Sequence, residues 1–306
     1  MDITVVGAGI IGLTTALTLE EQGHAVRVIA SATGSATTSA VAGAVWFPYR
    51  VGPKHKVARW AADTRSWLEN HARDPSSGID LLTGYEITTE TDANPPPPWW
   101  GANIEVSRIA APIADAPLAW SFLAPRAEPS LFMPWVTARL TATIETRPVT
   151  DLASEPGDVV INCTGLGARD ILDDSELVGL FGQIVLTEPG TVDRRITVTD
   201  DRNPDEVFYM IPRRDELVLG GCSIPWRRGA PLAADPAITD RILAHARRLG
   251  LGIGAVRTVR TGLRPFRNEV RLEREGRIIH NYGHGGAGFT LCRGCAEQVA
   301  ILVRMK

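Results

Sequence analysis

Short apolar runs and glycine turns alternate at the amino-terminal end of the chain. The run Ile3-Thr4-Val5-Val6 is β-branched and has no polar face, which is typical of a parallel strand buried on both sides. Residues 13–22 predict a helix that ends at Gly23, and residues 25–29 predict a second strand. Together these elements predict a βαβ unit.

The same buried-strand texture returns at residues 158–163 and 277–281. Alternating runs at residues 183–186, 207–211 and 217–219 predict an antiparallel sheet. Helices are predicted over residues 56–71, 129–140, 235–249 and 290–304, and the stretch from residue 46 to 140 is otherwise rich in proline and tryptophan. The pattern predicts an α/β fold in which a Rossmann-type nucleotide-binding domain is interleaved with an α+β domain on a mainly antiparallel sheet.

Composition narrows the class of protein. The chain has 306 residues, enough for about two domains, with 44% hydrophobic and 22% charged residues and a net charge of -3. Its basic residues are scattered, so we expect no nucleic-acid partner, and no membrane partner is expected either. Four cysteines make no disulfide framework, and only Met1 and Asp2 precede the first apolar run, so we expect a cytoplasmic protein.

The turn after the first strand carries a dinucleotide-binding pattern, Gly7-Ala8-Gly9-Ile10-Ile11-Gly12. Gly7 makes the tight turn, Gly9 lets the backbone approach a pyrophosphate, and Gly12 permits close packing of helix on sheet. The helix N-terminus then faces the anion. The second strand ends at Ser31 without the acidic residue that usually holds the ribose, so Ser31 is expected to supply one hydrogen bond there.

Three further stretches identify the family. Residues 37–49, Asn162-Cys163-Thr164-Gly165, and Arg264-Pro265 together with residues 280–290 resemble the D-amino-acid oxidase family of FAD enzymes, in the same order and over most of the chain. The resemblance implies noncovalent FAD, an FAD-binding domain at residues 1–47, 138–182 and 262–306, and a substrate-binding domain at residues 48–137 and 183–261. The expected cofactor-binding residues are Gly7, Ala8, Gly9, Ile10, Ile11, Gly12, Ser31, Thr37, Thr38, Gly43, Ala44, Val45, Val149, Thr164, Arg264, Gly285, Gly286, Gly288, Phe289 and Thr290.

The resemblance also implies the substrate residues. Arg264 is the expected carboxylate clamp, because a guanidinium fork matches a carboxylate and stays charged. Tyr209 adds a donor to the carboxylate, and the Gly286 carbonyl accepts from the substrate amine. The side-chain pocket is expected to be walled by Tyr49, Phe47 and Ile211.

The implied activity is oxidative deamination of neutral D-amino acids, with hydride transfer to flavin N5 and dioxygen as the second substrate. The products are 2-oxo acids, ammonia and hydrogen peroxide. Four other interpretations stay open: a glycine or sarcosine oxidase, a D-aspartate-preferring enzyme, an NAD-dependent dehydrogenase, and a non-catalytic FAD-binding module. Ser223 stands where a D-aspartate enzyme needs an arginine, although Arg50 is a second candidate cation. A homodimer is one option for the oligomeric state.

Two smaller motifs have expected roles. The segment at residues 200–206 is acidic and shorter than the lid segment of animal members of the family that the chain resembles, so the resemblance implies a reduced lid. Cys292 and Cys295 form a C-x-x-C pair, but they lie near the carboxyl terminus and not after the first strand of a thioredoxin-like unit. We therefore expect neither a redox nor a metal site there.

Overall fold

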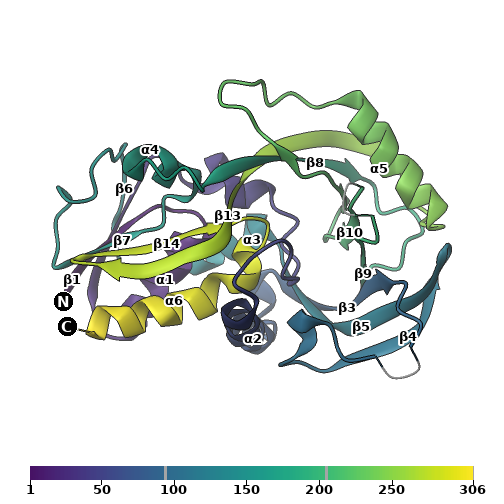
Figure 1. Ribbon diagram of the computed structural model, residues 1–306, viewed down its shortest axis with the longest axis horizontal. Coiled ribbons are helices and arrows are strands. Elements are labelled where there is room, and N and C mark those ends of the chain that lie inside the picture. Colours follow the sequence, from purple (N-terminus) through teal and green to yellow (C-terminus); the bar gives the residue numbers. More distant parts are fainter. Residues whose placement is uncertain (93–94, 204–205, 306) are drawn as a thin grey trace. The chain divides into compact units, whose positions relative to one another are not determined.

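The computed structural model describes residues 1–92, 95–203 and 206–305 (Figure 1). The chain divides into two compact units, each assembled from separated segments. Unit 1 comprises Met1–Ile79, Ala127–Gly179 and Arg264–Lys306, and unit 2 comprises Asp80–Arg126 and Leu180–Leu263. The predicted fold class is confirmed, because unit 1 contains a parallel sheet with helices and unit 2 contains a mainly antiparallel sheet.

Unit 1 is organised by a sheet of parallel strands. Their order is β14 (Ile278–His284), β7 (Val159–Asn162), β1 (Asp2–Val6), β2 (Ala25–Ala30) and β6 (Ile144–Thr146). The carboxyl-terminal part of β13 (Val256–Glu275) pairs antiparallel with β14. Both faces of β1 are covered, since the successive residues Ile3 and Thr4 are fully buried. Parallel strands bring their carboxyl ends to one edge, and this is the edge where α/β sheets bind ligands.

Helices cover this sheet. They are α1 (Ile10–Glu21), α2 (Lys54–His71), α3 (Pro129–Thr137), α4 (Ala168–Leu172) and α6 (Gly288–Arg304), with short 3-10 turns η1 (Gly34–Ala36), η2 (Thr38–Val41), η3 (Pro75–Ser77) and η5 (Gly165–Gly167). Helix α6 packs against α1, α2 and β14 (Figure 1). Helix α1 begins at Ile10, three residues before its predicted start, because Gly9 is the extended residue that precedes the helix.

The domain boundaries differ from the predicted ones. Residues 48–79 and 127–137 were expected in the second domain, but they belong to unit 1. Helix α2 crosses α6 at Gly294, whose N–H donates to the Thr64 hydroxyl at 2.9 Å, and a Cβ at Gly294 would lie 2.2 Å from the Trp60 carbonyl oxygen. Aromatic packing of Phe132 with Phe289 likewise ties α3 to α6. These contacts make both helices part of the unit that contains α6.

Unit 2 contains the mainly antiparallel strands of the same 14-stranded sheet. Its strands follow the order β4 (Val106–Ile113), β5 (Ala116–Ala127), β3 (Ile79–Thr88), β9 (Ile196–Asp200), β10 (Phe208–Pro212), β11 (Leu217–Gly220) and β8 (Val178–Thr187), and β12 (Ile224–Pro225) pairs with β8. The pairings given by register are antiparallel except that of β3 with β9. Two further elements are the turn η4 (Trp99–Gly101) and helix α5 (Pro236–Arg248), which packs on β10 and β11.

The sheet of unit 2 has one apolar face. Its core gathers Val198, Phe208, Met210 and Leu219 with Ile242 of α5. Tyr209 and Ile211 alternate with Phe208 and Met210 along β10, so their side chains point to the opposite face. The two predicted substrate residues of this unit therefore lie on the face of the sheet opposite this core.

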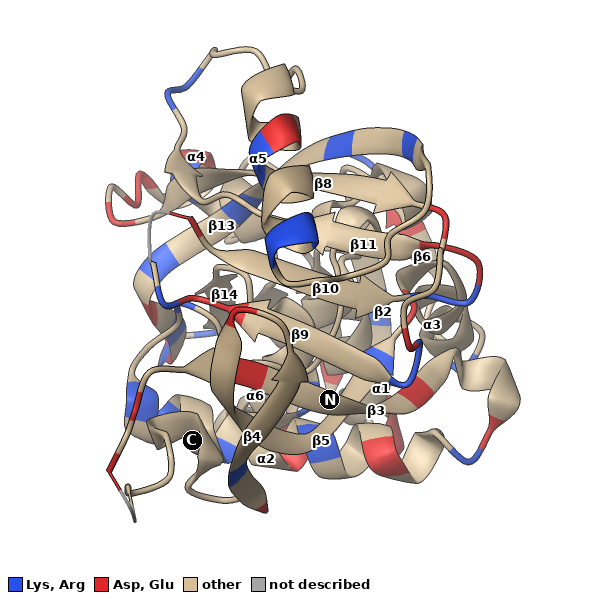
Figure 2. Cartoon of the chain, turned by 90° about the vertical axis from the view of Figure 1, so that its right-hand side faces the viewer, with Lys and Arg blue, Asp and Glu red and all other residues tan. Residues whose placement is uncertain are grey.

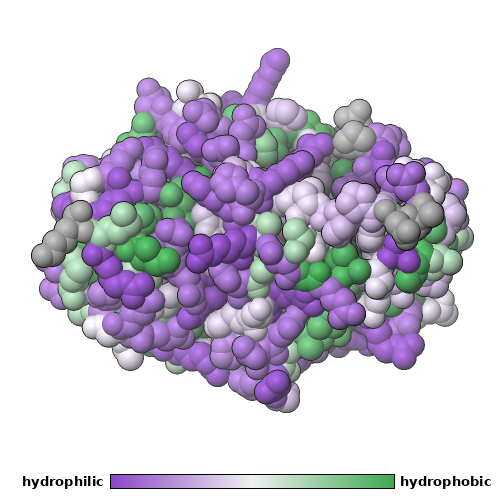
Figure 3. Space-filling model, turned by 60° about the horizontal axis from the view of Figure 1, so that its bottom comes forward, coloured by the Kyte–Doolittle hydropathy of each residue, from purple (hydrophilic) through white to green (hydrophobic). Residues whose placement is uncertain are grey.

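The surface is mixed in charge and hydropathy. Arginines occur along β13 and on α5, interspersed with Asp and Glu (Figure 2). On the face in Figure 3 hydrophobic residues form small groups among hydrophilic ones. Within the described residues, no helix is long and apolar enough to span a membrane.

Candidate active site

The glycine turn after β1 lies against the end of β7. Gly7 has a φ of +123°, and a Cβ there would lie 2.2 Å from the Cys163 carbonyl oxygen. A Cβ at Gly12 would lie 1.9 Å from the Gly7 carbonyl oxygen. Only glycine fits at both positions, so the turn brings the N-terminus of α1 to the carboxyl edge of the sheet.

The N-terminus of α1 fits an anionic group. A Cβ at Gly9 would have the Ser39 Oγ, at 3.1 Å, as its one neighbour within 4 Å among the residues described. The first turn of the helix carries no acidic side chain, and Ala8 and Ile10 are buried. Ser39 Oγ accepts a hydrogen bond from the Ile10 N–H at 3.0 Å. A backbone cradle without a side chain at Gly9 is what a pyrophosphate requires.

Ser39 was not among the predicted site residues. It lies in η2, and its contact spans the 29 positions that separate it from Ile10. Its neighbours were predicted: Thr37 donates its hydroxyl to the Gly34 carbonyl at 2.8 Å, and Thr38 is exposed. The only sequence signal for Ser39 was its place inside the Thr37–Val45 stretch that resembles the family.

The predicted adenosine-side residues follow neighbouring strands. Thr164 comes after β7, and Ser31, which is exposed, comes directly after β2. Val149 lies beyond β6 and packs against Val6, Leu152 and Val160. Because β1, β2, β6 and β7 are parallel, these residues lie at the edge of the sheet that also holds the glycine turn.

The C-terminal glycine block brings three predicted substrate residues together. A Cβ at Gly286 would lie 3.2 Å from Cδ1 of Tyr49 and 3.5 Å from Cδ of Arg264. Gly285 has a φ of +55° and donates its N–H to the Pro265 carbonyl at 2.8 Å. Arg264, Tyr49 and Gly286 therefore surround one point just before the start of α6.

The first turn of α6 is bound to the segment that carries Phe47. The Thr290 hydroxyl accepts from the Phe47 N–H at 3.1 Å and donates to the Phe47 carbonyl at 3.0 Å. The Phe289 ring packs on Phe132 in the core. The side chains of Phe289 and Thr290 are therefore engaged within the protein. What these two residues, together with Gly288, can present to a cofactor is their backbone N–H groups. The predicted Gly43-Ala44-Val45 turn precedes this segment, and Ala44 has a φ of +59°.

Tyr209 and Ile211 belong to unit 2, whereas Arg264, Gly286, Tyr49 and Phe47 belong to unit 1. The Tyr209 ring lies on the turn after β11, since a Cβ at Gly220 would lie 2.1 Å from its Cζ. Ile211 is buried. The hydroxyl of Ser223, which follows that turn, is buried without a hydrogen-bond partner in the described part of the chain.

His284 is a candidate that the sequence analysis did not select. It is the last residue of β14 and is buried, and burial lowers its pKa to about 3. Its Nε2 has no hydrogen-bond partner among residues 1–92, 95–203 and 206–305. A neutral imidazole thus precedes the glycine loop at neutral pH, and its place in Gly283-His284-Gly285 was the available signal.

Other predicted features have structural explanations. Cys292 and Cys295 are free thiols buried in α6, and burial raises the pKa of Cys292 to about 11. Burial also raises the pKa of Cys295, so neither thiol is poised as a thiolate. The acidic segment at residues 200–206 begins at Asp200, which is buried and bound to Arg202 and His245. Two of its members, at positions 204 and 205, lie outside the described residues.

Sequence relatives cover nearly the whole chain. The chain is 38% identical to a D-amino-acid oxidase of Rubrobacter xylanophilus over 313 residues, which span 97% of this chain and 94% of that protein. It is 37% identical to a D-amino-acid oxidase of Streptomyces coelicolor, with 98% and 96% covered.

Solved structures share the fold. A glycine oxidase of Bacillus cereus superposes with a TM-score of 0.77 at 17% identity, covering 100% of this chain and 96% of that one. The family model described as FAD dependent oxidoreductase matches residues 2–302, which supports FAD in place of the nicotinamide alternative. With its glycine cradle, its α6 loop and these relatives, the chain belongs to the FAD-dependent oxidoreductase family that includes the D-amino-acid oxidases.

Proposed function

We propose that the chain oxidises neutral D-amino acids to 2-oxo acids. One D-amino acid, one dioxygen and one water give one 2-oxo acid, one ammonia and one hydrogen peroxide. The observation that carries the proposal is the meeting of Arg264, Tyr49 and Gly286 before the start of α6. The two bacterial relatives at 37–38% identity, both D-amino-acid oxidases, support it.

Arg264 holds the substrate carboxylate. Its guanidinium presents parallel donors that match both carboxylate oxygens, and its half-buried position strengthens the charge interaction relative to open water. The resemblance implies Tyr209 as a further donor to the carboxylate. Carboxylate binding of this kind restricts the substrates to α-acids.

The Gly286 carbonyl accepts from the substrate amine, and Tyr49 and Phe47 bound the side chain. The resemblance implies Ile211 as a further wall residue. Fixing the carboxylate and the amine leaves one orientation for the Cα hydrogen and one direction for the side chain. Only the D-enantiomer then points its hydrogen at the cofactor. The enantiomer preference follows from two polar contacts and one apolar wall.

FAD would be held by several separated segments of unit 1. The N-terminus of α1 receives the pyrophosphate, Thr164, Val149 and Ser31 serve the adenosine side, and the Thr37–Val45 stretch and the start of α6 serve the ring. Bound FAD supplies the two-electron oxidation of the Cα–N bond and passes the electrons to dioxygen. The backbone N–H groups at the start of α6 stabilise the negative charge of the reduced ring.

The expected side-chain preference is for neutral substrates. Ser223 offers a hydroxyl where a D-aspartate enzyme needs a cation, so a second carboxylate has no matching charge at that position. A glycine or sarcosine oxidase is the alternative, favoured by the glycine-oxidase fold match alone. A cytoplasmic location, which the free cysteines support, and a homodimeric state remain predictions.

A substrate panel tests the function. The purified protein is assayed for peroxide, ammonia and 2-oxo acid with D-alanine, D-valine, D-methionine, D-aspartate, glycine, sarcosine and the L-enantiomers. We expect equal amounts of the three products from neutral D-amino acids. Highest kcat/KM for sarcosine or glycine would replace the proposal with the alternative, and a flavin-containing protein that is silent with all of them would refute it.

A further inference from the structure

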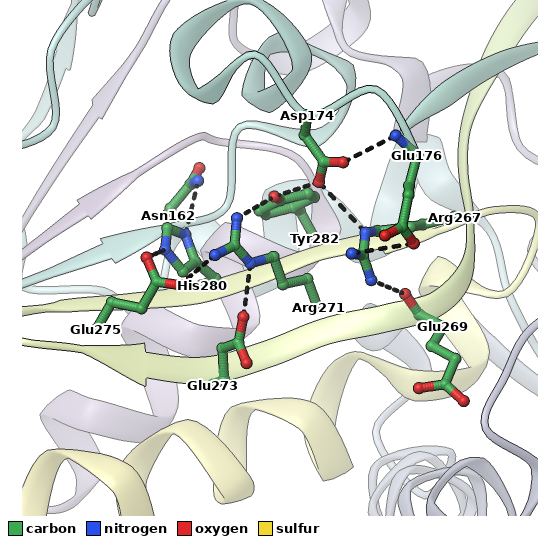
Figure 4. Close-up of polar contacts among 10 residues, drawn as sticks. All are labelled: Asn162, Asp174, Glu176, Arg267, Glu269, Arg271, Glu273, Glu275, His280 and Tyr282. Carbon is green, nitrogen blue, oxygen red and sulfur yellow. Dashed lines mark hydrogen bonds and ion pairs between the residues drawn. The ribbon is translucent and has the colours of Figure 1, made fainter.

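A buried amide and imidazole meet beside the glycine cradle. Asn162, the last residue of β7, places Nδ2 3.2 Å from Nδ1 of His280 in β14 (Figure 4). The two residues are 0% and 1% exposed. Water therefore cannot substitute for either partner, and their hydrogen bonds must be satisfied inside the protein.

The donors and acceptors around Asn162 fix its orientation. Its Oδ1 accepts from the Thr164 N–H at 3.2 Å and from the Thr164 hydroxyl at 2.7 Å. A backbone N–H can only donate, so Oδ1 must face Thr164 and the NH₂ group must face His280. Because the NH₂ group can only donate, Nδ1 of His280 must be an unprotonated acceptor.

The opposite side of His280 supports the same assignment. Nε2 lies 3.2 Å from Oε2 of Glu275, an acceptor, so the ring proton belongs on Nε2. Three other groups face this ring: Arg271, Glu273 and Tyr282. Arg271 also contacts Glu275, and the Tyr282 ring stands edge-on with its centroid 5.9 Å from that of His280. Figure 4 shows how this network continues through Tyr282 to Asp174 and Arg267.

Asn162 in turn holds the loop next to the glycine cradle. Both of its Oδ1 contacts are to Thr164, and the intervening Cys163 carbonyl is the group that Gly7 approaches. A second proton on His280 would set an N–H against the Asn162 NH₂ group. The amide would then have to turn, and its bonds to Thr164 would be lost.

We propose that His280, acting through Asn162, is a positioning residue that holds Thr164 for FAD binding, and that protonation of His280 weakens FAD binding. The inference rests on the proposed contact of Thr164 with the adenosine side of FAD. Neither His280 nor Asn162 touches the reacting atoms, so the effect is on cofactor retention and not on the chemical step.

Electrostatics set the direction of the pH dependence. Burial lowers the pKa of His280, and the nearby Arg271 lowers it further, so the ring is neutral at pH 7. FAD binds the neutral form, which means that the pKa of His280 is lower in the holoenzyme than after FAD release. Affinity is therefore full above the higher of the two values and falls as pH drops through them. The Glu275 pKa is lowered by its bond to His280, so this carboxylate stays ionised over the same range.

The experiment measures FAD retention by the holoenzyme at pH 5 to 8. Holoenzyme is diluted, and released FAD is quantified by its fluorescence after ultrafiltration. We expect the wild-type dissociation constant to rise about tenfold from pH 8 to pH 5, because FAD binds the neutral form of His280. His280→Asn retains an acceptor toward Asn162 and cannot titrate, so its dissociation constant should change by less than about twofold.

A matched control and a spectroscopic readout complete the test. His24→Asn removes an imidazole directly before β2, outside this network, and should keep the wild-type pH profile. Nitrogen NMR of the wild-type protein should show His280 as the Nε2-protonated neutral tautomer at pH 8, a readout that needs no variant to fold.

Three outcomes would overturn the inference. The first is that His280→Asn loses FAD at low pH to the same extent as the wild type. The second is that the wild-type affinity for FAD does not change with pH. The third is that His280 is charged or Nδ1-protonated at pH 8. In all three cases FAD still binds at pH 8 and the proposed oxidase function stands. A protein that takes up no FAD at pH 8 would instead refute the proposed function and this inference together.

Discussion

Arg264→Met tests the proposed carboxylate site most sharply. The Arg264 side chain is half-buried, with its Cδ 3.5 Å from the Cβ position of Gly286. Methionine keeps much of the apolar stem and removes the guanidinium. Removing one partner of a buried ion pair costs about 3–5 kcal/mol, and for a half-buried arginine we take the lower end, about 3 kcal/mol. This predicts a fall in kcat/KM of about a hundredfold.

The assay is steady-state peroxide production from D-alanine, with flavin content measured by absorbance in the same preparations. Arg264→Lys should recover only part of the loss, because an ammonium lacks the planar fork. Arg50→Met is the matched control: Arg50 is exposed, and its guanidinium carbon lies 5.6 Å from the Tyr49 ring centroid. Losing an exposed cation–π contact of about 0.5–1 kcal/mol should lower kcat/KM by only about two- to fivefold.

The reasoning fails if Arg264→Met keeps its flavin and stays within threefold, roughly 0.7 kcal/mol, of wild-type kcat/KM. A large loss in Arg50→Met with a small one in Arg264→Met would move the clamp to Arg50. Loss of flavin in Arg264→Met would show that this residue serves the cofactor first.

Three further changes have defined outcomes. Gly12→Ala should lower FAD content by roughly tenfold or more, because its Cβ would lie 1.9 Å from a backbone carbonyl oxygen. The control Gly167→Ala has its nearest contact at 3.5 Å and should bind FAD normally. Equal flavin absorbance in the two variants would contradict this. Asp200→Asn should lower stability by about 2–3 kcal/mol in urea unfolding, since it breaks the buried pair with His245. Burial raises the pKa of Asp200, but hydrogen bonds from Arg202 and His245 outweigh it and hold this pKa low. The carboxylate therefore stabilises the folded protein above about pH 4, and this stabilisation is lost as pH falls through the pKa of Asp200 in the folded state. An unchanged acid-unfolding midpoint in the variant would refute this. D-aspartate should have a lower kcat/KM than D-valine, because Ser223 supplies no charge, and the reverse order in the panel would place a cation in the pocket.

The first βαβ unit could be predicted almost residue by residue because its determinants are local. A buried β-branched run, glycines at fixed spacing and a glycine helix stop each act within a few residues. The same holds for α2 and α5, whose apolar faces recur at helical spacing.

Strand β13 was missed because its local pattern points elsewhere. Arg257, Arg260, Arg264, Arg267 and Arg271 recur every three or four residues, which is a helical spacing. Pairing with β14 overrides that pattern, with the register shift between Phe266 and Arg271 taking up the irregularity. Tertiary pairing of this kind is not visible in a single sequence.

Strands β4 and β5 were hidden by proline. Pro112 lies where the register of this pair shifts, between Ala110 and Ile113, and Pro117 lies next to the start of β5. Both are places where a strand tolerates a residue without an N–H. In the sequence these prolines are part of the proline- and tryptophan-rich stretch at residues 46–140, for which no strand was predicted.

The residues of the candidate site also differ in how far the sequence predicts them. Residues inside a motif, such as Gly7, Gly286 and Arg264, could be named from resemblance. Contacts between motifs could not, because Ser39 reaches Ile10 and Asn162 reaches His280 only after the chain has folded. The network around Asn162 spans 118 positions in sequence, and nothing local signals it.

The most direct test of the central claim is anaerobic mixing of the holoenzyme with D-alanine or L-alanine while the flavin absorbance is followed. This half-reaction needs no dioxygen, no product detection and no assumption about turnover. The account predicts that D-alanine bleaches the oxidised flavin band completely and that L-alanine leaves it unchanged. Equal bleaching by both enantiomers would contradict the proposed binding geometry, and a flavin band that persists with D-alanine and with the other neutral D-amino acids would contradict the function itself.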